Sequence, residues 1–196
     1  MIEIRQGFGE KESPQASRLY VIAFKRKFEK LIGEEAVMQE MFEKAINPAN
    51  CLCAYDEYSS LVGISGFHKG KNGLIDIKLT DFIQSFGLVK GLWKAVLTDL
   101  IFSRKALSEE ELLMDGIAVD TRFRGQGIGS QLFEALMDYG KNNGYKHIQL
   151  DVIDENPRAK ALYERVGFKK IRYQKVPAFI AKLIGVTGVT TMVKEL

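Results

Sequence analysis

Hydrophobic and polar positions follow two periodicities along this chain. Short apolar or alternating runs predict strands over residues 2–5, 51–56, 61–68, 111–119, 147–152, 168–174 and 189–194. Apolar residues recurring every three or four positions predict helices over residues 13–32, 34–46, 128–143 and 157–166. Strands and helices therefore intermingle along the chain, which indicates an α/β (α+β) fold.

Residues 71–108 do not fit this alternation of predicted strands and helices. Lys71-Asn72-Gly73 predicts a turn, and residues 76–102 are rich in Leu, Ile, Phe and Val. We expect one or two helices here, broken around Gly87 and Gly91. An interfacial helix is an alternative, but charged residues interrupt any span of membrane length: Lys78, Asp81, Lys90, Lys94 and Asp99. A packed helical hairpin over the sheet edge or the substrate cleft is therefore favoured over membrane contact.

Length and charge narrow the class of protein. A chain of 196 residues with 46% hydrophobic and 27% charged residues is typical of one globular domain, which we assign to residues 1–196. The net charge of +3 is too small to indicate nucleic acid, and no basic stripe interleaved with aromatics is present. We expect no nucleic-acid partner, although a polyanionic cofactor is compatible with this charge.

The cysteines do not indicate a metal site, and the N-terminus does not indicate a secretion signal. Cys51 and Cys53 stand two apart on a predicted strand, so both point to one face. The only histidines are His68 and His147, which is too few for a metal site, so we expect no metal and a buried apolar pair of cysteines. Residues 1–6 lack a basic or long apolar signal segment, and a cytoplasmic protein is the default expectation.

A glycine-rich loop lies between the strand at 111–119 and the helix at 128–143. It runs Arg124-Gly125-Gln126-Gly127-Ile128-Gly129-Ser130. The first N–H groups of a helix lack internal partners and attract anions, and glycines let a phosphate approach the backbone. No Lys follows as in a Walker A loop, and the glycine spacing differs from the dinucleotide fingerprint.

A second motif lies downstream, over residues 156–168. Asn156 suits the N-cap of a helix, Pro157 its first position and Gly167 the position just past its end. The apolar face predicted for this helix consists of Ala159, Leu162, Tyr163 and Val166.

These two motifs, Arg-x-x-Gly-x-Gly and Asn-x-x-Ala-x-x-x-Tyr-x-x-x-Gly-Phe, resemble the cofactor motifs of the GNAT family of N-acetyltransferases, in the family's order. The resemblance implies a GNAT fold: a central mixed, mostly antiparallel sheet of six to seven strands flanked by helices. Residues 71–108 would then be a helical insertion between the third and fourth strands. It also implies transfer of acetyl from acetyl-CoA, with coenzyme A as product, to a primary amine of a small molecule or peptide.

The resemblance assigns binding roles. It implies that the pantetheine arm pairs with the backbone of Ile117, Ala118 and Val119, and that residues 124–130 bind the pyrophosphate. Asn156 would hydrogen-bond the pantetheine, beside Ala159 and Tyr163. Arg122 either adds positive charge near the loop or is a solvated surface charge.

Catalytic roles are less strongly specified. By the resemblance, Tyr163 is the general acid for the leaving thiolate; otherwise it is a core aromatic residue. Glu111 matches the spacing of a base glutamate in histone-type members, but it ends an acidic run typical of a helix cap or solvated face. Asp115 shares its strand face and competes for the role, since an ionisable group among apolar neighbours is costly unless used. A water chain is the third alternative.

Two other classes of function remain open. The chain could be a catalytically inactive domain that binds acetyl-CoA as a sensor or scaffold, or an interaction or membrane-surface protein acting through residues 76–102. A homodimer is compatible with the sequence. The acceptor amine has no recognisable code in the first two helices, the insertion or the last loop.

Overall fold

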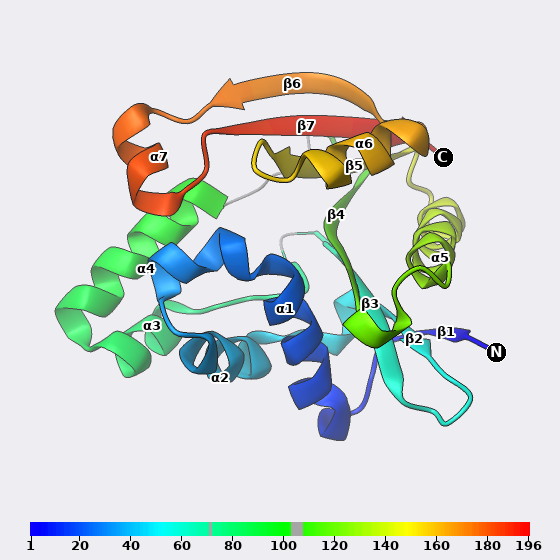
Figure 1. The fold of residues 1–196 in the computed structure, drawn as a ribbon, viewed down its shortest axis with the longest axis horizontal. Coiled ribbons are helices and arrows are strands. Elements are labelled where there is room, and N and C mark those ends of the chain that lie inside the picture. The colour runs from blue at the N-terminus through cyan, green and yellow to red at the C-terminus, as the bar shows by residue number, and fades with distance from the viewer. Residues whose placement is uncertain (71, 103–107) are drawn as a thin grey trace.

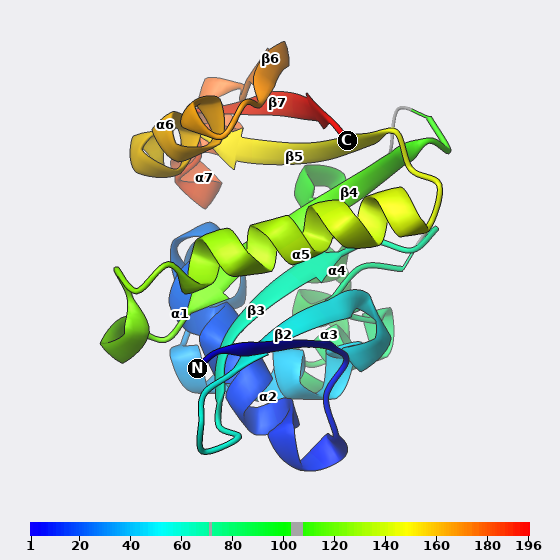
Figure 2. The same cartoon turned by 90° about the vertical axis from the view of Figure 1, so that its right-hand side faces the viewer.

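The computed structural model describes residues 1–70, 72–102 and 108–196, and a seven-stranded mixed sheet flanked by helices organises them (Figures 1 and 2). The strands are β1 Glu3–Gln6, β2 Cys51–Tyr55, β3 Leu61–Phe67, β4 Glu111–Val119, β5 His147–Ile153, β6 Lys169–Lys175 and β7 Gly188–Glu195. The α-helices are α1 Ser13–Ile32, α2 Glu35–Ala45, α3 Leu79–Phe86, α4 Leu88–Phe102, α5 Ile128–Asn142, α6 Pro157–Arg165 and α7 Ala178–Ile184. Short 3₁₀ turns cover η1 Glu10–Glu12, η2 Pro48–Asn50 and η3 Thr121–Phe123.

The sheet has the strand order β1-β2-β3-β4-β5-β7-β6. Every neighbouring pair is antiparallel except β4 and β5, which run parallel. This parallel pairing is short, because it joins only residues 111–113 of β4 to residues 147–149 of β5. Beyond it the two strands diverge, as Figure 2 shows, and the sheet opens into a splay.

Two apolar cores lie on opposite faces of the sheet. Helices α1 and α2 cover one face, with Phe28 and Phe42 packed edge-on at 5.2 Å between ring centroids. Helix α5 covers the other face through Leu132 and Leu136, both fully buried. This inward row follows from the 3.6-residue period of the helix.

A β-bulge in β4 changes which side chains face α5. Gly66 of β3 pairs with Gly116 and Phe67 pairs with Met114, so Asp115 is the extra residue. Met114 packs in the core under α5, and beyond the bulge Ile117 does so, whereas Ala118 packs under α1. The bulge therefore places Asp115 and Gly116 at the opening of the splay.

The predicted helical insertion is confirmed between β3 and β4, except that residues 71 and 103–107 lie outside the described residues. Gly87, with φ of 76°, separates α3 from α4 as expected. The predicted break at Gly91 is wrong, because Gly91 lies inside α4. A Cβ there would stand 2.7 Å from the Ile83 Cα, so this glycine lets the two helices pack closely.

The exposed surface of α4 is more apolar than a fully packed hairpin would give. Phe82 of α3 is buried in the core under α1 and α2. Among the described side chains of α4, however, five large apolar ones are exposed: Leu88, Val89, Leu92, Trp93 and Val96. Among the described residues, no helix combines the length and apolar character needed to cross a bilayer.

Helix α6 begins and ends where its sequence predicts, but its apolar face is narrower. Asn156 caps it, and Gly167 follows it with φ of 95°. Ala159, Tyr163 and Val166 pack on the core as expected. The inward placement predicted for Leu162 is wrong, because this side chain is 44% exposed.

Candidate active site

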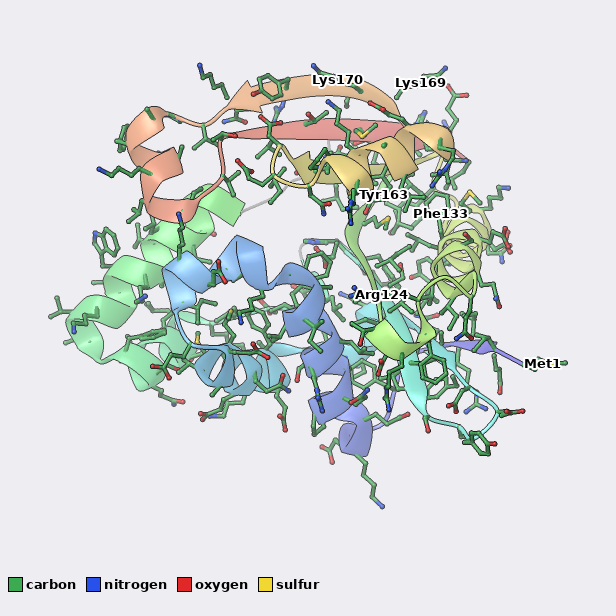
Figure 3. All side chains as sticks on the ribbon, viewed as in Figure 1. Met1, Arg124, Phe133, Tyr163, Lys169 and Lys170 are labelled. Atoms are coloured by element: carbon green, nitrogen blue, oxygen red, sulfur yellow. The ribbon has the colours of Figure 1, made fainter. Side chains whose placement is uncertain are left out.

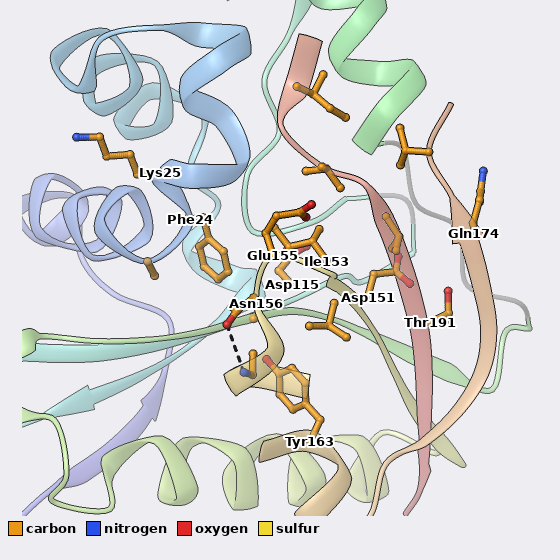
Figure 4. Close-up of a pocket in the computed structure, with 18 of the residues that line it drawn as sticks. Phe24, Lys25, Asp115, Asp151, Ile153, Glu155, Asn156, Tyr163, Gln174 and Thr191 are labelled. Atoms are coloured by element: carbon orange, nitrogen blue, oxygen red, sulfur yellow. Dashed lines mark hydrogen bonds between the residues drawn. The ribbon is translucent and has the colours of Figure 1, made fainter. Parts of the chain in front are cut away.

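A cleft of about 590 Å³ opens where β4 and β5 diverge. Its walls come from α1, β4, β5, α6, β6, β7 and α7. Figure 4 shows side chains from these elements directed toward one space, with Asp115, Phe24 and Tyr163 among them. Every wall therefore depends on tertiary packing around the splay, and the polar groups in it come from distant parts of the chain.

The loop from β4 to α5 is braced before the glycines begin. The Asp120 N–H donates to the Val62 carbonyl at 2.9 Å, which fixes the end of β4 against β3. The Asp120 carboxylate accepts from the Arg122 backbone N–H at 2.9 Å and from its guanidinium at 2.8 Å. The Arg122 guanidinium holds the pKa of Asp120 below its ordinary value. Arg122 therefore braces the turn, although its side chain is 76% exposed.

The glycine loop presents backbone rather than side chains at the start of α5. Gly125 and Gly127 have φ of 80° and 78°, a left-handed conformation that glycine adopts without strain. Gly127 is the N-cap of α5, and its carbonyl accepts from the N–H groups of Ser130 and Gln131. The N–H groups earlier in the chain therefore come before the first hydrogen bond within the helix. A Cβ on either glycine would meet nothing within 4 Å, which leaves room for an anion.

Arg124 links this loop to the end of β4. Its Nε donates to the Val119 carbonyl at 3.3 Å, and the residue lines the cleft. Figure 3 shows Arg124 near the start of the loop, on the side of the molecule where Tyr163 lies above it. A positive charge therefore stands where the cleft meets the glycine loop.

The outer half of β4 has one paired edge. Ile117, Ala118 and Val119 pair with β3, while the pairing of β4 with β5 ends at Leu113. The second edge of this stretch therefore faces the splay. Backbone groups at such an edge can bind an extended ligand by strand addition.

Helix α6 brings two predicted residues to the cleft. The Asn156 side chain accepts from the Ala159 N–H at 3.2 Å and so caps the helix (Figure 4). Tyr163 lies on the same side, half-buried, with its ring edge-on to Phe168 at 5.6 Å. The phenol ring extends from α6 toward the cleft in Figure 4. Asn156, Ala159 and Tyr163 all line the cleft.

The two candidate carboxylates lie at different points on β4. Asp115 lines the cleft, and its side chain is 11% exposed. Glu111 is the first residue of β4, opposite His147, where β4 and β5 are still paired. Its Oε2 accepts from the Ser108 N–H at 3.3 Å, and it is not among the residues that line the cleft. The structure brings Asp115, but not Glu111, to the space that Tyr163 faces.

His68 is a site residue that sequence reasoning missed. Its Nε2 lies 2.7 Å from Oδ1 of Asp115, and the Leu74 N–H donates to Oδ2 at 2.9 Å. These residues are 47 and 41 positions away from Asp115, so no local motif joins them. The signal that could have found the pair is strand register, because the His68 N–H donates to the Leu113 carbonyl beside the bulge.

Acidic groups continue along the cleft beyond Asp115. Asp151 on β5 and Glu155 in the following loop both line it. Glu155 Oε1 accepts from the N–H and the hydroxyl of Thr187, at 2.8 and 2.6 Å. Lys25 of α1 also lines the cleft, but its ammonium pairs with Glu35 at 2.8 Å. Several carboxylates thus line the cleft.

The cysteines lie outside this chemistry. Their Sγ atoms are 3.5 Å apart inside the core, and both residues are fully buried. Burial raises the pKa of the Cys51 thiol well above its ordinary value, with Cys53 adding to the shift. Within the described residues, no group of three or more His, Cys, Asp or Glu side chains could hold a metal ion.

Comparison with known proteins identifies the class. The acetyltransferase (GNAT) family matches residues 18–168, which contain the glycine loop, Asp115 and Tyr163. The chain belongs to the GNAT family of acetyltransferases.

Curated relatives match over shorter segments. A probable N-acetyltransferase, camello, from Xenopus tropicalis is 33% identical over 73 residues, which are 37% of this chain and 33% of that protein. The thialysine N-epsilon-acetyltransferase of Bos taurus is 32% identical over 66 residues, 34% of this chain and 39% of that protein. The matched segments thus span between a third and two fifths of these relatives.

Solved structures share the fold over the whole chain. A GCN5-related N-acetyltransferase from Kribbella flavida has a TM-score of 0.61 at 16% identity, covering 100% of this chain and 98% of its own. A polyamine N-acetyltransferase from Drosophila melanogaster has a TM-score of 0.58 at 20% identity, covering all of both chains. At these identities the likeness defines the fold alone.

Proposed function

We propose that residues 1–196 form one acetyl-CoA-dependent N-acetyltransferase domain that acetylates a primary amine of a small molecule or peptide. The observation that carries this proposal is the meeting of three features at one cleft. Arg124 at the start of the glycine loop lines it, the outer edge of β4 faces the splay in which it lies, and Tyr163 and Asp115 line it.

The donor would bind along a continuous path of backbone groups. Its pyrophosphate fits the N-terminus of α5, in the loop of residues 124–130. Gly125 and Gly127 carry no side chain there, and the space beside them is open. Its pantetheine amides fit the edge of β4 at Ile117, Ala118 and Val119. Asn156 and Ala159 stand at the end of this path, and the sulfur would come to rest near Tyr163.

The reaction then requires one attack and two proton movements. The neutral amine nitrogen attacks the thioester carbonyl carbon, forming the C–N bond, and the C–S bond breaks with its electron pair on sulfur. Asp115 accepts a proton from the amine, and the Tyr163 hydroxyl donates a proton to the leaving thiolate. After the products leave, Asp115 gives its proton to water and Tyr163 takes one from water, so the reaction leaves both side chains as they began.

Asp115 is the better candidate for the base. It lines the cleft, whereas Glu111 is held by Ser108 where β4 and β5 are still paired. A base must come within hydrogen-bond reach of the proton it removes, directly or through one water. Position in the cleft therefore favours Asp115.

The acceptor side favours an amine with an apolar portion. Asp115, Asp151 and Glu155 provide negative charge, while Phe24 and Ile180 provide an apolar wall. Names of similar proteins include thialysine and polyamine acetyltransferases, which agree with a small cationic acceptor.

Release of the coenzyme A thiol tests the proposal. The purified chain is mixed with acetyl-CoA and a panel of alkylamines, diamines and peptides, and free thiol is followed by a colorimetric reagent. Thiol release that depends on an amine supports the enzyme. Calorimetric binding of acetyl-CoA without any amine-dependent release would instead support the sensor or scaffold, and absence of binding would contradict both.

A further inference from the structure

We propose that His68 is a positioning residue for Asp115, fixing this carboxylate as an oriented anion at the base of the acceptor cleft. The proposal deepens the proposed function and rests on it. It assigns a role to a residue outside both cofactor motifs, directly after the end of β3.

The geometry of the pair is specific. His68 Nε2 and Asp115 Oδ1 are 2.7 Å apart, with side chains only 18% and 11% exposed. An ionised carboxylate can only accept, so the hydrogen in this contact belongs to Nε2 of His68. Short bonds of this kind to a charged partner are stronger than neutral ones, and they stabilise the ionised form of the acid.

The second oxygen is held by the start of the insertion. The Leu74 N–H donates to Asp115 Oδ2 at 2.9 Å, so each carboxylate oxygen contacts a residue that is not among those lining the cleft. Two donors from different elements fix the plane of the carboxylate as well as its position.

A further layer holds these donors in place. The side-chain amide of Asn50, which is buried, donates to the carbonyls of Asn72 and Gly73 at 2.6 and 3.1 Å. Gly73 has no side chain where one would collide with His68, because a Cβ there would lie 2.8 Å from the imidazole ring. The turn is therefore shaped around the imidazole, which indicates that this ring has one fixed place.

Other groups around the pair bear on its charge. The charged and titratable residues that line the cleft are Lys25 from α1, Arg124 from the glycine loop, Asp151 and Glu155 from β5 and its loop, Tyr163 from α6 and Arg172 from β6. The Cys51 thiol on β2 also experiences the charge of Asp115, but burial raises its pKa and keeps it neutral.

The test compares His68→Leu with His68→Gln and with the matched control His147→Leu, on the other histidine of the chain. We expect His68→Leu to lower kcat/KM for the amine about 10- to 100-fold. It should also move the acidic limb of the pH profile to higher pH, because loss of a donor favours protonated Asp115. His68→Gln, whose amide can still donate, should recover part of the rate. Acetyl-CoA affinity by calorimetry should stay unchanged in all three.

A double-mutant cycle with Asp115→Asn separates positioning from a general structural effect. If His68 acts through Asp115, His68→Leu should lower the rate no further in the Asp115→Asn background. Equal fold-losses in both backgrounds, a wild-type rate and profile for His68→Leu, or an equal loss in His147→Leu would each overturn the proposal. Wild-type turnover is measured first, so failure of the enzyme itself is distinguished from failure of this role.

Discussion

The ring of Phe24 on α1 lies directly against the backbone of Gly116 in β4. A Cβ on Gly116 would stand 2.8 Å from the Phe24 Cε1 and closer still to Cζ. Gly116 also has φ of 143°, which side-chain-bearing residues rarely adopt. The bulge that opens the splay and the helix that covers it therefore meet at a position where only glycine fits.

Replacing this glycine tests that contact. Gly116→Ala should lower the free energy of unfolding by about 1–3 kcal/mol, because a methyl group is forced into a packed site and a strained φ. Denaturant unfolding measures the change. Phe24→Ala removes the collision, so Gly116→Ala should cost less stability in the Phe24→Ala background than in the wild type, and an equal cost in both backgrounds would show that the crowding is not the cause.

The glycine loop can be tested with a matched pair of positions on α5. Gly127 precedes the helix and Gly144 follows it, with φ of 78° and 79°, and a Cβ at either would meet nothing within 4 Å. Both replacements carry similar backbone strain, but only Gly127→Glu places a negative side chain in the anion site. Calorimetry should show acetyl-CoA binding lost in Gly127→Glu and retained in Gly144→Glu. Similar affinities for the two variants would argue against a phosphate site.

Tyr163→Phe isolates the hydroxyl from the ring. The ring contact with Phe168 persists, so the fold and cofactor affinity should barely change. Turnover should fall roughly 10- to 1,000-fold, as for loss of one general acid. Tyr145→Phe, outside the residues that line the cleft, is the control and should keep the wild-type rate. A wild-type rate for Tyr163→Phe would make Tyr163 a packing residue only.

Separate replacements distinguish the carboxylates of β4. Asp115→Asn should flatten the ascending limb of the kcat/KM profile and lower the rate at neutral pH, because it removes the proton acceptor. Glu111→Gln should change neither, since Glu111 lies outside the residues that line the cleft. Amine ionisation produces a similar limb, so the comparison between variants is the decisive measurement. If neither replacement matters, a water chain serves as the base.

The Asp120 brace should make stability depend on pH. Arg122 lowers the pKa of Asp120 in the folded chain. The stabilisation from Asp120 is therefore fully present above the pKa of the unfolded chain, and it is lost as the pH falls through the pKa of the folded chain. Asp120→Ala should lower Tm by about 2–4 °C near pH 7, for loss of a cap of about 1 kcal/mol. Differential scanning calorimetry should show the Tm difference between Asp120→Ala and the wild type disappearing below about pH 4. Asp138→Ala on the exposed side of α5 should show no such difference.

Local patterns predicted most of the fold because its elements end at strong signals. Helix α1 spans the predicted 13–32 and stops at Gly33, and Asn156 caps α6 through its own side chain. The errors concern packing between elements. Gly91 looked like a helix break, but it allows close contact with α3. Leu162 has the right spacing for the core, yet its side chain is 44% exposed.

The site was predictable where a motif is continuous in sequence and not where strands bring residues together. The glycine loop and Tyr163 lie in short motifs, so their place in the cleft could be anticipated. The pairing of His68 with Asp115 depends on the β3–β4 register and on one extra residue in β4. Neither can be derived from periodicity, because a bulge shifts every later residue to the opposite face.

The short parallel pairing of β4 with β5 also has a thermodynamic consequence. Three residue pairs hold the β1–β4 half of the sheet to the β5–β7–β6 half along this seam, and the rest of the seam is a wedge. A ligand that fills the wedge and pairs with the edge of β4 bridges the two halves of the sheet for as long as it is bound. Occupancy then adds RT ln(1 + [L]/Kd) to the stability of the joined sheet. Under the proposed function, the cohesion of this protein then varies with the concentration of the ligand that occupies the gap.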